Sequence, residues 1–279
     1  MAYYYEEIVK NMESYDNFEY WFLPVTKYGI NVYKDGKFLE YLPIGCDVPD
    51  EYKTDFEKYK CRPEFLIYNL DKSKLNFNEP YELFKILLAG AELIVRFSEI
   101  NKNPDSIISN VDKCIKWLDD SDFKVAPAST RFHENYSGGL LIHTLNVVFE
   151  SFELQSLEKF KRVNLGRILR CSLLHDFCKI GLYESYYKNV KNEVTGVWDK
   201  VQSYKIKEQK MLQFGHGVSS MYLATKFFKL SIEESYAIRW HMGKFRCSDD
   251  EVYELGYCNE NYPIVYLLQF ADQLSITSY

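Results

Sequence analysis

Apolar and polar residues follow two different patterns on either side of about residue 75. Between about 17 and 48 the apolar residues form short aromatic and β-branched runs, whereas from Pro80 onward they recur every three or four positions. The second spacing is typical of amphipathic helices, and Pro80 suits the first turn of one. We therefore predict a helix through 83–97. Further helices are expected at 3–14, 104–119, 139–157, 163–176, 209–228, 231–242 and 262–277.

The N-terminal part contains signals for short β-strands. Asp35-Gly36 separates two apolar runs at 28–33 and 38–42, and Asp-Gly between such runs favours a hairpin with a two-residue turn. A further short strand is expected at 65–68. The hairpin residues predicted to share one face are Ile30, Val32, Leu39 and Tyr41.

A second hairpin is expected inside the helical part of the chain. Residues 182–210 alternate Tyr, Val and Lys, with Gly196 as a turn residue, and such alternation indicates strands rather than helix. We predict a mainly α fold, with an all-helical bundle at the C-terminus that carries this hairpin as an insertion. A small N-terminal α+β region precedes it. The predicted division is 1–75 and 76–279.

Composition and charge narrow the function only slightly. Of the 279 residues, 47% are apolar and 27% are charged, which is ordinary for a globular protein. The net charge of −6 provides no overall positive field for nucleic acid. Aromatic residues make up 17% of the chain, and we interpret them as an aromatic-rich core with tyrosines on the surface.

Secretion and membrane insertion are not indicated. The seven cysteines form no CxxC pair, and the first residues have neither the basic start nor the apolar stretch of a signal peptide. The most apolar predicted helix, at 83–97, carries Lys85, Glu92 and Arg96, which a membrane span would exclude. We expect a cytoplasmic protein.

The histidines point to a metal centre. The chain has five, all between residues 133 and 241, and four of them lie with two aspartates in apolar helical contexts. Burying one such polar group without a partner costs about 1–3 kcal/mol, so six are expected to satisfy one another or an ion. Imidazole and carboxylate are common ligands of divalent metals. The six residues are His143, His175, Asp176, His216, His241 and Asp272.

The motifs around these residues resemble the HD-domain superfamily of metal-dependent phosphohydrolases. The segments that carry the likeness are GGLLIHT, LLHDFCK with its HDxxK pattern, FGHG, WHMGK and FADQLS, within about 130–279. The chain lacks the GYP part of the HD-GYP phosphodiesterases. It is locally similar to HD-type 3′–5′ exoribonucleases, in which a histidine-bearing loop also precedes Gly-Gly-Leu-Leu, although the OB domain that normally precedes those enzymes is not evident.

The resemblance implies one or two divalent ions, drawn from Fe, Mn, Ni, Co and Zn. It assigns the second ion to His216 and His241, with Asp176 as a bridge, and implies that two ions clamp a phosphoryl group and hold a bridging hydroxide as nucleophile. The ligands implied for the first ion are His143, His175, Asp176 and Asp272.

The likeness also suggests catalytic side chains. Asp176 would act as the ligand that bridges the two ions. Lys179, one turn later, would place its ammonium group against the negative charge that develops on phosphate in the transition state. His133 precedes the Gly-Gly turn and would contact phosphate or protonate the leaving group.

Three basic residues are candidates for substrate binding. Arg131 lies in the loop before Gly-Gly, while Arg239 and Lys244 flank His241. Each could contact phosphate, and exposure to solvent is the alternative for each. Cys178, inside the HDxxK pattern, is interpreted as a packed thiol.

We therefore expect a phosphohydrolase that acts on a nucleotide or another small phosphoester. One alternative is a 3′–5′ exonuclease or phosphodiesterase on single-stranded nucleic acid, with the tyrosines of 182–210 as a stacking platform. Others are a non-catalytic HD ligand sensor and a di-iron oxygenase. In the nuclease alternative, the lysines that would contact phosphates beside the stacking tyrosines are Lys188, Lys191, Lys200, Lys205, Lys207 and Lys210.

The oligomeric state and the role of residues 1–75 stay open.

Overall fold

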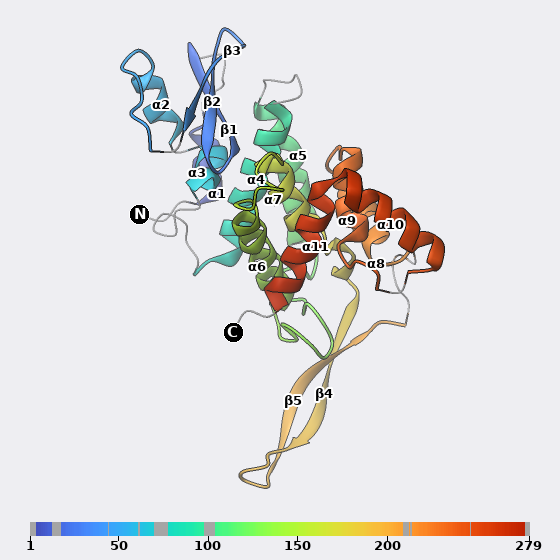
Figure 1. The fold of residues 1–279 in the computed structure, drawn as a ribbon. Helices are drawn as coiled ribbons and strands as arrows, with labels where there is room; N and C mark the ends of the chain where they lie inside the picture. Colours follow the sequence, from blue (N-terminus) through green and yellow to red (C-terminus); the bar gives the residue numbers. More distant parts are fainter. Residues whose placement is uncertain are drawn as a thin grey trace.

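The computed structural model places a helical body between two small antiparallel sheets. In Figure 1 the three-stranded N-terminal sheet lies at one end of the body, and a long two-stranded hairpin projects from the other end. Within the part of the chain that is described, no helix combines the length and apolarity needed to cross a bilayer. The described residues are 4–12, 18–43, 45–60, 62–69, 78–97, 104–208, 212, 214–245 and 247–276.

The described residues of the N-terminal region form three short helices and three strands. The strands form one antiparallel sheet in the order β1-β2-β3. Asp35 and Gly36 both have positive φ, 49° and 73°, as a two-residue hairpin turn requires, so the predicted turn is confirmed. The elements are α1 (Tyr5–Lys10), β1 (Tyr20–Thr26), β2 (Gly29–Lys34), β3 (Lys37–Pro43), α2 (Lys53–Tyr59) and α3 (Pro63–Asn69).

Two predictions for this region were wrong. A β-bulge leaves Leu39 without a partner, because Tyr33 pairs with Phe38 and Val32 pairs with Glu40. An extra residue turns the following side chains to the opposite face, so Leu39 and Tyr41 are exposed. Leu42 takes their place in the core beside Ile30 and Val32.

The predicted strand at 65–68 lies instead within helix α3. Pro63 opens this helix, and Phe65, Leu66 and Ile67 are all buried. A short apolar run with no polar alternation suits a buried helix as well as a strand. In this fold the segment packs against α4 as a helix.

The helical body confirms most of the predicted helices. Its central element, α4, is buried from residue 83 to residue 95 and packs against α3, α5, α6 and α7. α8 begins only at His216, while 209–211 and 213 lie outside the described residues. α10, which was not predicted, begins at a capping box of Ser248 and Glu251. The body consists of α4 (Pro80–Phe97), α5 (Pro104–Asp119), α6 (Gly139–Leu154), α7 (Leu165–Leu174), the 3₁₀ turn η2 (Phe177–Lys179), α8 (His216–Ala224), α9 (Ile232–Trp240), α10 (Asp249–Asn261) and α11 (Pro263–Ile276).

The predicted second hairpin is present between η2 and α8. β4 (Tyr183–Lys191) pairs with β5 (Trp198–Ile206) along nine residues of each strand. The predicted domain boundary near 75 falls within 70–77, outside the described residues, and stays a prediction. The buried core itself continues from the sheet into the helical body.

Candidate metal centre

The six predicted ligands come together inside the helical body. They come from five helices or helix ends: His143 from α6, His175-Asp176 just after α7, His216 from the start of α8, His241 just after α9, and Asp272 from α11. His143, His175 and His241 are fully buried, and Asp176 and Asp272 nearly so. Residues up to 129 positions apart in the sequence therefore form one buried polar cluster.

One side of the cluster joins two histidines to two carboxylates. Nε2 of His143 lies 3.1 Å from Asp272 Oδ1 and 3.4 Å from Asp176 Oδ2. Nε2 of His175 lies 3.4 Å from Asp176 Oδ2 and 3.8 Å from Asp272 Oδ1. The two Nε2 atoms are 3.4 Å apart. A set of donors this close, in a buried site, is suited to surround one cation.

The other side of the cluster faces the second oxygen of the same aspartate. Nε2 of His216 lies 2.8 Å from Asp176 Oδ1, and Nε2 of His241 lies 3.7 Å from it. The rings of His216 and His241 are 5.1 Å apart between centroids. Asp176 therefore presents Oδ2 to His143 and His175 and Oδ1 to the other two histidines, which are the pairs that the resemblance assigns to different ions.

Hydrogen bonds on the outer side of the rings determine which nitrogen faces the centre. Nδ1 of His175 is 2.7 Å from the carbonyl of Ser172, and Nδ1 of His241 is 2.7 Å from the carbonyl of Ile238. Because a carbonyl only accepts, each Nδ1 carries the hydrogen and each Nε2 keeps its lone pair. This arrangement is typical of metal-binding histidines. The Nε2 of His241 has no hydrogen-bond partner among the described residues, which leaves its lone pair available for an ion.

His143 is oriented in a similar way by a side chain. Its Nδ1 lies 3.3 Å from Ser275 Oγ, and that hydroxyl donates to the carbonyl of Asp272. The hydroxyl hydrogen is thus engaged, so Oγ accepts from Nδ1. Ser275 was not singled out from the sequence, although it lies three residues after Asp272 on the same helix.

Protons and ions compete for this centre. Burial by itself would lower the pKa of His143, but hydrogen bonds to Asp176 and Asp272 outweigh it and raise the pKa to about 9. The pKa of His216 is likewise raised to about 10, against burial, by Cys178 and Asp176. Burial and the neighbouring histidines lower the pKa of His241 to about 3. In the metal-free protein, protons on two rings therefore balance the carboxylates, and binding of an ion would displace them.

The two aspartates stay ionised despite their burial. Burial by itself would raise the pKa of Asp176, but Lys179 and the neighbouring histidines outweigh it and hold that pKa well below its usual range. Burial by itself would also raise the pKa of Asp272, but the hydrogen bond with His143 and the charges of the nearby histidines outweigh it and lower that pKa. Ionised carboxylates, together with imidazole nitrogens whose protons an ion would displace, are a donor set that fits Fe, Mn, Co, Ni or Zn, so the residues present fit a divalent ion.

Two further residues next to the centre were not assigned to it from the sequence. Cys178, interpreted from the sequence as a packed thiol, is half-buried, and its Sγ lies 3.2 Å from Nδ1 of His216. Together with Asp176 and His216 it forms a second potential ligand group, beside that of His143, His175 and Asp176. Its position two residues after the His-Asp pair was the only available signal.

Glu134, like Ser275, was not singled out from the sequence. Its Oε2 lies 3.9 Å from Nδ1 of His143, and Glu134, His133 and His143 form a third potential ligand group. Glu134 has a φ of 39°, in the left-handed region that residues other than glycine rarely adopt. Its carbonyl lies where a Cβ on Gly139 would stand, at 1.9 Å, so the loop can approach helix α6 this closely only because residue 139 is glycine.

The structure places the predicted catalytic residues at or near the cluster. Lys179 is buried, with Nζ 2.5 Å from Asp176 Oδ2, so its charge is paired with the aspartate. The His133 ring lies 4.9 Å from the His143 ring between centroids. Burial, followed by the charges of His143 and Lys179, lowers the pKa of His133 to about 4. A ring that is neutral near pH 7 suits accepting a hydrogen bond better than protonating a leaving group.

The predicted substrate-binding residues are not brought into the cluster. Arg131 and Lys244 are exposed. Arg239 forms an ion pair with Glu254 on α10, at 3.1 Å, and its guanidinium lies 4.3 Å from the centre of the Trp240 ring. Sequence adjacency to a ligand therefore does not bring these side chains onto the centre, and their binding of phosphate stays a prediction.

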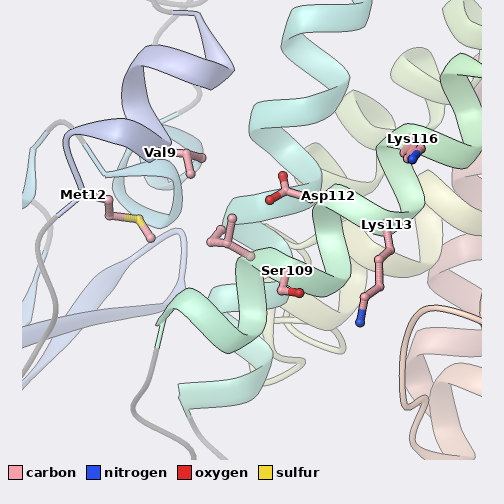
Figure 2. A pocket seen from close by; sticks show the side chains of 7 residues that line it. Val9, Met12, Ser109, Asp112, Lys113 and Lys116 are labelled. Atoms are coloured by element: carbon pink, nitrogen blue, oxygen red, sulfur yellow. The ribbon is translucent and has the colours of Figure 1, made fainter.

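A surface hollow elsewhere, between α1 and α5, has no comparable chemistry (Figure 2). Its one carboxylate, Asp112, accepts a hydrogen bond from Tyr5 at 2.8 Å, and Lys113 and Lys116 are exposed. The residues that line it are Val9, Met12, Ile108, Ser109, Asp112, Lys113 and Lys116.

Comparison with known proteins adds no independent assignment. The chain matches no protein-family model, no curated protein and no solved structure. The buried histidine and aspartate cluster is compatible with an HD-type metal centre, and the case for a function therefore depends on the geometry of this cluster.

Proposed function

We propose that this protein is a metal-dependent phosphohydrolase of the HD type, built on a helical bundle. The observation that carries the proposal is the shared carboxylate. The two oxygens of Asp176 face two different pairs of histidines, with His143 and His175 on one side and His216 and His241 on the other. Pairs of ions bridged in this way are a recurrent arrangement in phosphatases and nucleases.

The proposed reaction is hydrolysis of a phosphoester. A water oxygen forms a new bond to phosphorus, one ester P–O bond breaks, and the leaving oxygen takes up a proton. Bound ions would polarise the phosphoryl oxygens and lower the pKa of a coordinated water to near neutrality. The chain holds the six donors at fixed positions, and Lys179 places a buried positive charge beside Asp176, where negative charge on a phosphoryl group would be stabilised.

The test is a hydrolysis screen of the purified protein after reconstitution with Mn, Fe, Ni or Zn. The substrates are nucleoside mono- and triphosphates, cyclic mono- and dinucleotides, short single-stranded oligonucleotides and bis(p-nitrophenyl) phosphate. We expect metal-dependent hydrolysis of at least one class. Asp176→Asn should abolish it, because the amide cannot bridge two cations. Asp120→Asn, at an exposed position just after α5, is the matched control and should retain full activity.

Two results would overturn the proposal. Absence of bound metal after reconstitution would show that the six residues do not form a metal centre. Stoichiometric metal with no hydrolysis across the panel would leave a protein that binds ions without catalysis, as the sensor alternative requires.

A further inference from the structure

The two faces of the β4–β5 hairpin differ in charge. The strands pair Tyr183 with Ile206 at the base of the hairpin and Lys191 with Trp198 at its far end. Because side chains alternate between the faces of a strand and cross-strand partners share a face, this register assigns each residue of both strands to one of two faces.

The first face, which we call the aromatic face, has no carboxylate. It contains four aromatic side chains and two lysines, and its other members are neutral. Both acidic residues of the two strands, Glu184 and Asp199, lie on the opposite face with Lys188 and Lys205. The aromatic face therefore carries a charge of about +2, whereas the charges of the opposite face cancel. The six residues that define the aromatic face are Tyr183, Tyr187, Lys191, Trp198, Lys200 and Tyr204.

The outer part of the aromatic face is open to solvent. Tyr187 is 69% exposed and Trp198 is 65% exposed, and Lys191 and Lys200 are also exposed. Two exposed aromatic rings on one face of a projecting hairpin (Figure 1) mark that face as a candidate interaction surface. Aromatic rings interleaved with lysines stack on bases and pair with phosphates, a combination typical of surfaces that bind single-stranded nucleic acid.

The base of the same face adjoins the candidate metal centre. β4 begins four residues after Lys179, whose Nζ is 2.5 Å from Asp176. The hydroxyl of Tyr183 lies 3.5 Å from the carbonyl of Ala128, in the loop that also carries His133. The hairpin thus begins directly after the segment that supplies the HDxxK residues, and Tyr183, at the base of the aromatic face, contacts the loop that carries His133.

We propose that the aromatic face of the β4–β5 hairpin binds single-stranded nucleic acid and directs the strand toward the metal centre. The directing role depends on the proposed function, whereas the binding itself does not. The overall charge of −6 does not oppose this, because a strand on the aromatic face meets two lysines and no carboxylate there.

A second copy of the chain is the competing occupant of this face. Two aromatic faces brought together would place four lysines in one interface with no carboxylate from either face, and like charges there would repel. A strand of phosphates neutralises the same lysines. Charge complementarity therefore favours nucleic acid over self-association.

Binding can be tested without catalysis. A fluorescein-labelled single-stranded 12-mer of DNA or RNA is titrated with the full-length protein in EDTA, and anisotropy reports the affinity. Tyr187→Ala with Trp198→Ala should weaken binding about 10-fold or more, given the usual contribution of base stacking. The matched control is Tyr186→Ala with Val201→Ala, which removes exposed apolar side chains from the opposite face and should change affinity less than about 2-fold.

Charge is tested in the same way. Binding is measured at several salt concentrations, and log Kd is plotted against the logarithm of the salt concentration. Lys191→Gln with Lys200→Gln should reduce the slope of this plot by about 1.4, the value for two phosphate contacts on a single strand. Lys188→Gln with Lys205→Gln makes the same change in net charge on the opposite face, and it should leave the salt dependence nearly unchanged.

The outcomes separate this inference from the proposed function. Binding lost specifically in the aromatic-face variants supports the inference even when hydrolysis is never detected. Equal effects on both faces, or no binding by wild type, would overturn it even when mononucleotides are hydrolysed. Sedimentation analysis tests whether a second copy of the chain binds this face instead. If the wild type is a dimer and the variant Tyr187→Ala with Trp198→Ala is a monomer, the face is an interface between copies, and the inference is overturned.

Discussion

At the scale of single residues, orientation of the histidine rings depends on very local contacts. His175 and His241 each follow directly after the end of a helix, and each donates from Nδ1 to the carbonyl three residues earlier. Carbonyls in the last turn of a helix lack intrahelical partners, so the ring satisfies one of them and turns Nε2 toward the centre. A histidine at such a position is recognisable from sequence once the helix end is known.

Cys178 provides the residue-scale prediction. Its Sγ contacts the outer nitrogen of His216, so Cys178→Ala should weaken binding of the second ion by roughly 10–100-fold, as loss of an outer partner usually does. Cys178→Ser keeps a hydrogen-bonding atom and should lie within a few-fold of wild type. Elemental analysis and competition with a chelator measure the effect.

Cobalt substitution adds a readout that distinguishes two roles of this thiol. A thiolate-to-cobalt charge-transfer band in the near ultraviolet would show direct ligation, whereas its absence would indicate that Cys178 positions His216. Cys46→Ala, at an exposed cysteine in the N-terminal region, serves as the control. Unchanged affinity in Cys178→Ala would contradict the prediction.

At the scale of elements, a buried arginine links the helices that end at the ligands. Arg170 on α7 is fully buried and forms ion pairs with Glu92 on α4 and Glu234 on α9. Glu234 also closes the capping box of α9 with Ser231. α7 ends just before His175 and α9 ends just before His241, so this network sets the spacing between two helix ends that are followed by ligands.

We expect Arg170→Met to destabilise the protein by about 3–5 kcal/mol, because two buried carboxylates lose their counter-charge. Denaturant unfolding measures this change. Arg167→Met, on the same helix, removes the partly exposed ion pair with Glu233 and should cost about 1 kcal/mol or less. Replacing Glu92 and Glu234 by Gln in the Arg170→Met background should restore part of the stability. Similar losses for the two arginine variants would contradict the assigned role.

At the scale of the whole molecule, the centre joins helices from α6 to α11, so ions that bind it should stabilise the fold. A ligand that binds only the folded state at about 100 times its Kd adds roughly 2.7 kcal/mol. For a chain of this size that corresponds to a rise in Tm of about 5 °C. Thermal unfolding of chelator-treated protein with and without added Mn or Zn measures the shift.

His241→Gln is the informative variant for this measurement. It removes the one fully buried imidazole nitrogen of the cluster that lacks a hydrogen-bond partner within the described residues, so the metal-induced rise in Tm should shrink. Asp120→Asn should retain the full rise. An identical rise in all three proteins would place the stabilising ion elsewhere.

The sequence by itself determined the features that depend on local spacing. The three-to-four residue period predicted the main helices, Asp35-Gly36 predicted the first hairpin turn, and the alternation through 182–210 predicted the second hairpin. The order of histidines and aspartates identified the six residues that the fold gathers. Each of these signals arises within one element or at its ends, where backbone preference and side-chain periodicity act directly.

Only the tertiary structure decided features that depend on contacts between distant segments. The bulge at Leu39 and the helical state of 65–68 follow from packing against other elements. The pairing of Arg239 with Glu254, the contact of Cys178 with His216, and the division of the Asp176 oxygens between two histidine pairs likewise join separate segments. Spacing along one element cannot encode such distances, because they are determined by how whole helices pack together.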